Sequence, residues 1–120
     1  MQYQYARIQS IFRKGGAQVE ELRANPPDLI LNSEAERSLA LQLLRFSEAL
    51  AQAAAEYKPH LIPGYLWDLS KCYGIFYQNC RVLQAESPEL RSSRLLLCDL
   101  TARTIRLGLH LLGIQTAERM

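Results

Sequence analysis

Residues 87–113, SPELRSSRLLLCDLTARTIRLGLHLLG, carry the strongest structural signal in this chain of 120 residues. Ser87 is a favourable N-cap, and Pro88 follows it at the first helical position, where the missing N–H of proline costs nothing. Leucines recur through the stretch at three- and four-residue spacings, and Gly113 is a typical residue just past a helix end. The stretch therefore predicts one long helix.

Four further helices are predicted upstream, and no segment alternates as a strand does. The segment from Gly15 to Asn32 is expected to be a loop with at most one helical turn. Leucines on more than one face of the second helix predict a central position. The four helices are expected over Tyr3–Lys14, from a Ser33–Glu36 capping box, from Ser47 to Tyr57, and from Pro63 or Tyr65 to Cys80. The fold class is therefore all-α, a bundle of about five helices in one domain, residues 1–120.

The composition limits the classes of protein to which the chain can belong. Hydrophobic residues make up 48% and charged residues 22%, with a net charge of +2, which is typical of a folded globular domain. No segment resembles a signal peptide or a membrane span, so a cytoplasmic location is expected. The three cysteines, Cys72, Cys80 and Cys98, have no metal-ligand spacing and are expected to be buried free thiols.

Signatures of catalysis are missing from the sequence. There is no glycine-rich phosphate loop, no GxSxG motif and no HExxH pair. Asp99 and Arg103 are spaced for an i,i+4 ion pair, which we assign to the scaffold on an exposed face. No catalytic residue, metal site or cofactor is expected, and an autonomous enzyme is disfavoured.

Aromatic and basic residues are interleaved in the first and fourth predicted helices. Tyr3 and Tyr77 are accompanied by cations such as Arg7, Lys71 and Arg81. Single-stranded RNA loops are bound by this combination, because unstacked bases lie on aromatic faces while cations meet phosphates. Aromatic residues at helical spacing are more often part of a core, so the composition leaves both interpretations open.

Three stretches, at the start, in the middle and at the end of the chain, carry a resemblance to one family. The first is Gln2-Tyr3-Gln4-Tyr5-Ala6-Arg7-Ile8 with Ser10-Ile11-Phe12-Arg13-Lys14, in which Tyr5 replaces the usual histidine. The middle stretch runs from Leu39 through Pro59-His60 and Phe76-Tyr77 to Cys80-Arg81-Val82-Leu83. The last runs from Leu90-Arg91 through Thr101-Ala102-Arg103 to the terminal Glu118-Arg119-Met120. Together these stretches resemble the C-terminal DALR-type anticodon-binding domain of arginyl-tRNA synthetases.

The resemblance implies a helical domain of the class I synthetase type that receives the anticodon loop of arginine tRNA, whose central cytosine is a major identity element. Carried over by position, Tyr3, Tyr77 and Met120 would bind the anticodon, and Arg7, Arg13 and Lys14 would bind phosphates. The partners implied are arginine tRNA and the catalytic domain of the same synthetase, with neither DNA nor a membrane. The nucleotide-binding half of the family would lie ahead of Met1, so arginine attachment would belong to a domain absent from this chain.

An alternative from another class is a free-standing homologue that keeps the fold but acts as a protein-interaction or regulatory module. The two hypotheses differ in where Tyr3, Tyr77 and Met120 lie. Exposure of all three side chains in one shared cleft would favour RNA binding. Burial of the three in the core would favour the alternative.

Overall fold

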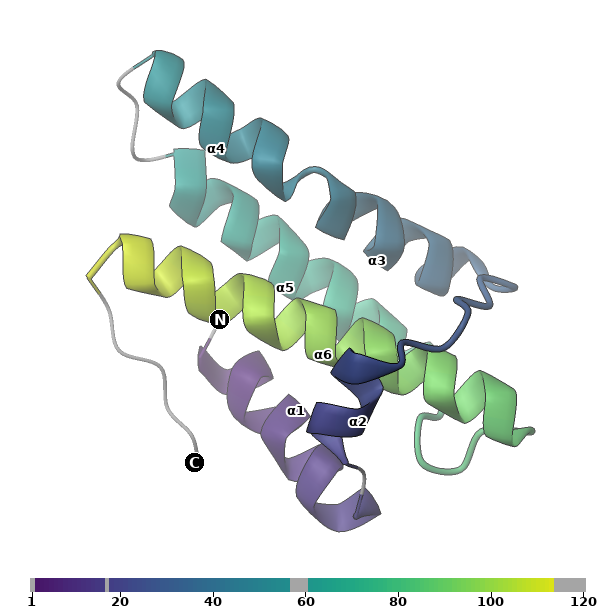
Figure 1. The fold of residues 1–120 in the computed structure, drawn as a ribbon. Helices are drawn as coiled ribbons and strands as arrows, with labels where there is room; N and C mark the ends of the chain where they lie inside the picture. The colour runs from purple at the N-terminus through teal and green to yellow at the C-terminus, as the bar shows by residue number, and fades with distance from the viewer. Residues whose placement is uncertain (1, 17, 57–60, 114–120) are drawn as a thin grey trace.

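The computed structural model describes residues 2–16, 18–56 and 61–113, and in these ranges it contains helices and no strand (Figure 1). The helices are α1 (Gln2–Gly15), α2 (Val19–Ala24), α3 (Glu34–Leu44), α4 (Phe46–Ala55), α5 (Leu61–Asn79) and α6 (Pro88–Leu111). The predicted all-α bundle of about five helices is confirmed. The sixth is the six-residue α2, which lies in the segment expected to hold at most one turn.

The helix boundaries follow the predicted capping residues at the strongest signals. Ser87 caps α6, because its hydroxyl accepts a hydrogen bond from the Leu90 N–H at 3.1 Å. Ser33 and Glu36 form both halves of the capping box at the start of α3. Gly16 follows α1 with a φ of +63°, a left-handed conformation that glycine adopts without a Cβ penalty.

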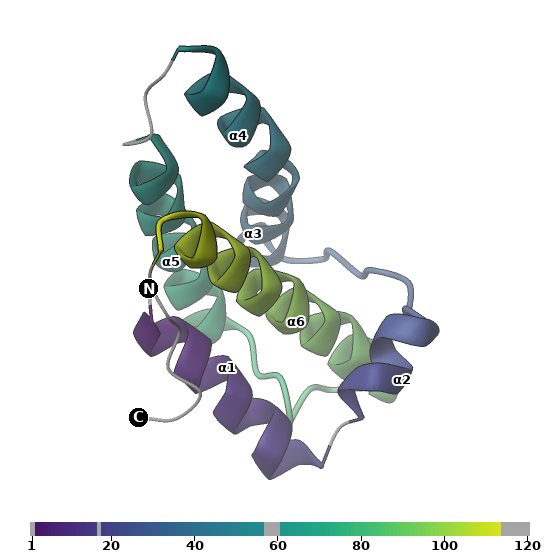
Figure 2. The ribbon, with the colours of Figure 1, turned by 60° about the vertical axis from the view of Figure 1, so that its left-hand side comes forward.

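Helices α5 and α6 form the middle of the molecule (Figures 1 and 2). Helices α3 and α4 lie along α5 on one side, while α1 and α2 lie against α6 on the other. Seven consecutive residues of α6, 93–99, are buried. The largest side chains of the core that lie entirely out of contact with solvent are Ile8, Leu39, Leu66, Leu69, Tyr73, Phe76, Leu97 and Ile105.

Two helix predictions are wrong in detail. Helix α3 lies at the edge of the bundle instead of its centre: only Glu36 and Leu39 are buried, and Leu44 is 78% exposed. Leucines on several faces did not mean burial on several sides, because in the described part of the chain α3 packs on its neighbours with one face. Helix α4 begins at Phe46 after Arg45, so Ser47 lies inside the helix and does not cap it.

Asp99 belongs to the scaffold as predicted, but it does not lie on an exposed face. Its pair with Arg103 exists, at 3.1 Å, but the Asp99 side chain is buried instead of exposed. Arg23 of α2 donates two hydrogen bonds to the same carboxylate, at 2.9 and 3.1 Å, and this contact raises the pKa of the Arg23 guanidinium. Since α2 buries none of its residues, the bidentate pair is a main tie between α2 and α6.

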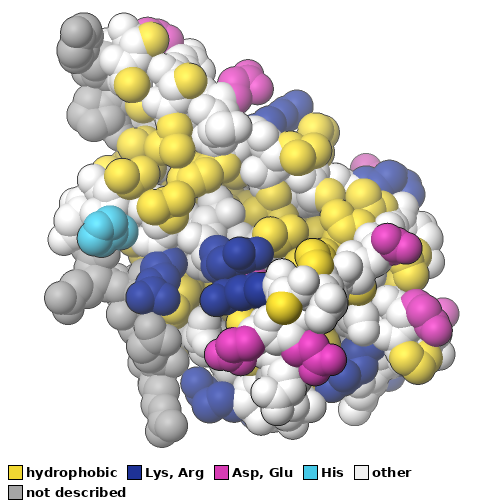
Figure 3. Space-filling view, in the orientation of Figure 1, with side chains coloured by type: hydrophobic (Ala, Val, Ile, Leu, Met, Phe, Trp, Pro, Cys, Tyr) yellow, Lys and Arg dark blue, Asp and Glu magenta, His cyan; other side chains and the backbone are white. Residues whose placement is uncertain are grey.

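One face of the molecule carries both hydrophobic and basic side chains at its surface (Figure 3). Figure 3 shows hydrophobic side chains reaching the surface over the upper part of one face and Lys and Arg side chains gathered near its middle. None of the described helices is long and apolar enough to cross a bilayer.

Cys80 and Cys98 are buried free thiols as predicted, Cys72 is partly buried, and burial raises the pKa of Cys98 to about 12.

Candidate nucleic-acid interface

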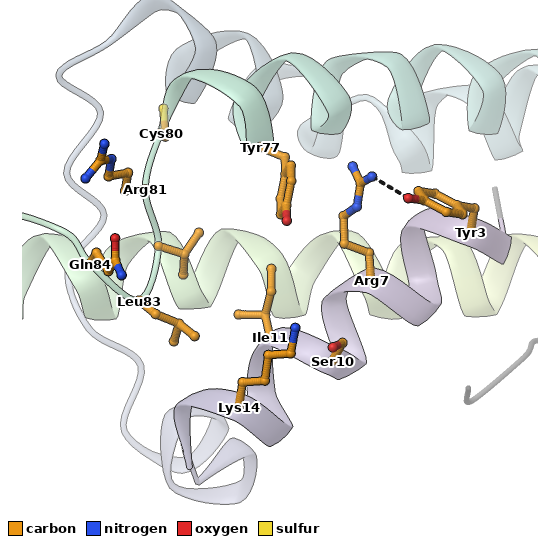
Figure 4. A pocket seen from close by; sticks show the side chains of 11 residues that line it. Tyr3, Arg7, Ser10, Ile11, Lys14, Tyr77, Cys80, Arg81, Leu83 and Gln84 are labelled. Carbon is orange, nitrogen blue, oxygen red and sulfur yellow. Dashed lines mark hydrogen bonds between the residues drawn. The ribbon is translucent and has the colours of Figure 1, made fainter. Parts of the chain in front are cut away.

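A surface pocket of about 540 Å³ lies between α1 and the C-terminal end of α5 (Figure 4). The segment that leaves α5 closes one side of it. The pocket is lined by Tyr3, Arg7, Ser10, Ile11 and Lys14 of α1, by Tyr77 of α5, and by residues 80–84. Ile11 and Val82 are buried against the core, so the inner wall is apolar and the rim is polar and basic.

Arg7 lies between the rings of Tyr3 and Tyr77. Its guanidinium carbon is 4.5 Å from the Tyr3 ring centroid and 4.2 Å from the Tyr77 ring centroid, and Nη2 donates to the Tyr3 hydroxyl at 2.7 Å. Tyr3 and Arg7 meet because residues four apart lie on one face of a helix. Figure 4 shows the Tyr77 ring reaching down from α5 towards them.

Both tyrosine rings are accessible to a ligand. Tyr3 is 53% exposed and Tyr77 is 42% exposed, whereas the neighbouring Phe76 is buried in the core. Tyr73 lies behind Tyr77, with ring centroids 6.3 Å apart, and burial raises the pKa of the Tyr73 hydroxyl so that it stays neutral. A planar group that enters the pocket therefore meets aromatic faces and a guanidinium plane, all suited to stacking.

The predicted phosphate-binding cations divide into two groups. Arg7 and Lys14 line the pocket, because seven residues are nearly two helical turns and bring both to the face of Tyr3. Arg13 is exposed but is not among the lining residues, since it lies one residue, or about 100°, away from Lys14 around the helix. Met120 lies outside the described residues.

Arg81 is a lining residue that the sequence prediction of the site did not include. It comes just after the end of α5, in the segment that closes one side of the pocket. With Arg7 and Lys14 it makes three cations around the pocket, and none of the described lining residues is acidic. The sequence had grouped Arg81, four residues after Tyr77, with the cations that accompany the tyrosines, but only the fold brings it close to α1.

A buried ion pair supports the segment that carries Arg81. The Arg94 guanidinium donates to the Arg81 backbone carbonyl at 2.7 Å and to the Glu36 carboxylate at 3.2 Å. Glu36 also accepts from the Ser33 hydroxyl at 2.7 Å, within the capping box of α3. The wall of the pocket is thereby fixed to α3 and α6 by groups that are shielded from water.

The described residues offer little to a metal ion. No group of three or more His, Cys, Asp or Glu side chains in residues 2–16, 18–56 and 61–113 is arranged to hold one. His110 is exposed in the last turn of α6 and is not among the residues that line the Tyr3–Tyr77 pocket. The described lining of this pocket offers aromatic faces, hydrogen-bonding groups and positive charge.

Comparison with known proteins identifies the class of domain. The family model described as "DALR anticodon binding domain" matches residues 1–120. The chain therefore belongs to the DALR anticodon-binding domain family. Within that family it is of the type found in arginyl-tRNA synthetases, which confirms the resemblance seen in the sequence.

Individual relatives agree with this assignment. The chain is 52% identical to the arginine–tRNA ligase of Streptomyces coelicolor and 48% identical to that of Escherichia coli O127:H6, over all 120 residues in each case. It spans 20% of the length of each. The Thermus thermophilus arginyl-tRNA synthetase superposes with a TM-score of 0.84 at 41% identity, over 99% of this chain and 20% of that one. The Plasmodium falciparum arginyl-tRNA synthetase gives 0.85 at 35% identity, over 98% and 20%.

Proposed function

We propose that residues 1–120 are one domain that binds the anticodon loop of arginine tRNA and that the Tyr3–Arg7–Tyr77 pocket receives an unstacked anticodon base. The observation that carries the proposal is the exposed stack of one guanidinium between two tyrosine rings. The relatives supply the identity of the RNA, since those compared above are named arginine–tRNA ligases or arginyl-tRNA synthetases.

The proposed recognition uses the two tyrosines as stacking planes. A base that enters displaces the Arg7 guanidinium from one ring or stacks against it, and each good base–aromatic stack contributes about 1–3 kcal/mol. The central cytosine of the anticodon is the base we assign to the pocket. Its exocyclic amino group is a hydrogen-bond donor, which matches the tyrosine hydroxyls as acceptors.

The cations are proposed to bind the phosphates around that base. Lys14 of α1 and Arg81 of the segment after α5 both line the pocket, and Arg13 precedes Lys14 on α1. Each cation that neutralises a phosphate releases counterions, so affinity should fall as salt concentration rises. Replacing Lys14 by glutamine should weaken binding of every RNA loop alike and lower the slope of log affinity against log salt by about one.

Met120 remains part of the proposal as a residue of the anticodon site. Its terminal carboxylate would accept from the amino group of cytosine, and its thioether would pack against the base. In the same proposal, arginine is attached by the catalytic domain of a parent arginine–tRNA ligase in the cytoplasm. The parent protein's partners are then arginine tRNA and that domain, with no role for DNA or a membrane.

The experiment is a titration of the 120-residue chain into two labelled RNA hairpins that reproduce the anticodon stem and loop of arginine tRNA. One hairpin keeps the central cytosine and the other replaces it with guanine. The cytosine hairpin should bind at least tenfold more tightly, because guanine is larger than cytosine and presents a different hydrogen-bonding edge to the pocket. Equal affinity for the two hairpins would sink the anticodon-reading proposal and favour the protein-interaction alternative.

Variants of Tyr77 test whether the affinity for the cytosine hairpin depends on the pocket. Tyr77→Ala should weaken binding of the cytosine hairpin by roughly 5- to 150-fold, the equivalent of one stack of about 1–3 kcal/mol. Tyr77→Phe keeps the ring and should retain most of the affinity. Leu107→Ala is the matched control, since Leu107 is also an exposed large side chain but lies on α6 outside the pocket.

A further inference from the structure

A second pocket of about 500 Å³ adjoins the first and shares Tyr3 with it. It lies between the start of α1 and the middle of α5. The residues that matter for its chemistry are Tyr3, Gln4, Trp67, Ser70, Lys71 and Gln78. Tyr3 thus stands between two hollows on one surface of the molecule.

Trp67 and Lys71 form the outer wall of this second pocket. They are four residues apart on α5, and the Lys71 ammonium lies 5.4 Å from the Trp67 ring centroid. Trp67 is 56% exposed, so part of its indole is accessible from solvent. Gly74, one turn further along the same face, leaves the floor of the pocket without a side chain.

Polar groups surround the space beside the indole. The Gln4 side-chain amide donates to the Ser70 carbonyl at 3.3 Å, which holds the amide at the inner edge, and Gln78 lines the opposite end. Among the described residues, Ser70 Oγ is a buried side-chain oxygen without a hydrogen-bond partner. Rotation about its Cα–Cβ bond changes where that hydroxyl points, so a polar ligand can satisfy it.

The distribution of exposed aromatic residues points to a shared role. Three aromatic side chains in the described part of the chain are exposed, Tyr3, Trp67 and Tyr77, and all three line these two adjoining pockets. The other described aromatic rings are wholly or partly buried. Exposed rings contribute little to folding, whereas a row of aromatic faces with cations beside them is what a single strand of RNA needs for successive bases.

We infer that the Trp67–Lys71 pocket is a second base subsite, which takes the nucleotide next to the one bound between Tyr3 and Tyr77. The inference rests on the proposed function and extends it from one base to two. The base stacks on the accessible part of the Trp67 indole, and Lys71 meets a phosphate. The amides of Gln4 and Gln78 offer both donors and acceptors, so this subsite tolerates different bases, unlike the cytosine pocket.

Trp67 is the single tryptophan of the chain, so its fluorescence reports on this subsite alone. The 120-residue chain is titrated with the unlabelled cytosine hairpin while indole emission is followed. A nucleobase stacked on the indole quenches it, and the quenching should saturate at the same dissociation constant that anisotropy of the labelled hairpin gives. Unchanged indole emission at saturating hairpin would overturn the second subsite.

A variant and an altered RNA test the same contact from both sides. Trp67→Ala should weaken binding of the hairpin about five- to tenfold, while Leu107→Ala leaves it unchanged. Removing the base at one loop position next to the central cytosine should weaken binding to the wild-type chain by a similar factor and weaken binding to Trp67→Ala no further. Additive losses at every loop position would contradict a stack between that base and Trp67.

The outcomes separate this inference from the proposed function. If Tyr77→Ala weakens binding but Trp67→Ala does not, the second subsite is wrong and the anticodon pocket stands. If Tyr77→Ala keeps full affinity, the proposed function fails at its own pocket. Thermal unfolding by circular dichroism should give Trp67→Ala a midpoint close to wild type, because the side chain lies mostly outside the core.

Discussion

Arg7 lies between two exposed tyrosine rings, and this position bears directly on how a base would enter the pocket. A cation over an exposed ring is stabilised by about 0.5–1 kcal/mol, which is less than the roughly 1–3 kcal/mol that a stacked base offers. A base can therefore displace the guanidinium from a ring with a net gain. The displaced Arg7 remains charged and is then free to meet a phosphate of the same RNA.

Tyr65 gives a prediction about alkaline pH. Its hydroxyl donates to the Gln42 carbonyl, and burial raises its pKa from the usual 10 to about 12. The unfolded chain loses this proton near pH 10 while the folded chain keeps it to about pH 12. The free energy of unfolding should therefore be fully retained below pH 10 and decline between pH 10 and pH 12.

Urea unfolding at pH 8, 10 and 11 measures this decline. Tyr65→Phe should be less stable at pH 8 by about 0.5–1.5 kcal/mol for the lost hydrogen bond, and its stability should fall less steeply above pH 10. Tyr3→Phe is the matched control, since the Tyr3 ring is exposed. An equally steep fall in Tyr65→Phe and wild type would rule out Tyr65 as a source of the pH dependence.

At the scale of elements, α5 and α6 meet through Gly108. A Cβ added there would lie 2.8 Å from both terminal methyl carbons of Leu66, a side chain that is itself fully buried. Helix propensity alone would favour alanine over glycine by about 1 kcal/mol. The close contact at this crossing outweighs that preference, because Leu66 has no free space into which to move.

Two glycine variants separate packing from propensity. Gly108→Ala should lower the free energy of unfolding by up to about 2 kcal/mol, the net of an overpacking cost of about 1–3 kcal/mol and a propensity gain of about 1 kcal/mol. Gly64→Ala, also within a helix but with open space around its Cα, should raise stability by about 0.5–1 kcal/mol. Chemical denaturation measures both, and a stabilised Gly108→Ala would show that the α5–α6 crossing can adjust.

At the scale of the whole molecule, one buried network joins three distant parts of the chain. The Arg94 guanidinium of α6 donates both to the Glu36 carboxylate at the start of α3 and to the Arg81 carbonyl after α5. Because Glu36 and Arg94 are both buried, their charges are compensated mainly by each other. The stability of the bundle and the position of the pocket wall are therefore linked.

Neutralising Glu36 tests this link. Glu36→Gln should lower the free energy of unfolding by about 2–4 kcal/mol, since it leaves the buried Arg94 charge without its partner. Glu34→Gln, an exposed acid in the same first turn of α3, should change stability by less than about 1 kcal/mol. Equal effects of the two substitutions in a denaturation experiment would contradict a stabilising role for the buried Glu36–Arg94 ion pair.

The helical class, the capped starts of α3 and α6, and the family could be predicted without the structure, because capping, periodicity and motif residues are local properties of the chain. The sequence also singled out Tyr3, Tyr77, Arg7 and Lys14, which the fold brings to one pocket. It misjudged α3 and Asp99, since hydrophobic or charged character does not say which neighbour covers a face.

Which of the candidate residues meet depends on how the helices pack. Arg13 and Lys14 are adjacent in sequence but lie about 100° apart around α1, so one lines the pocket and the other does not. Arg81 joins the pocket, and Trp67 stands beside Tyr3, because α1 packs across α5 and α6. Proximity between distant segments depends on how the helices pack, and this is why the two adjoining pockets became visible only in the folded chain.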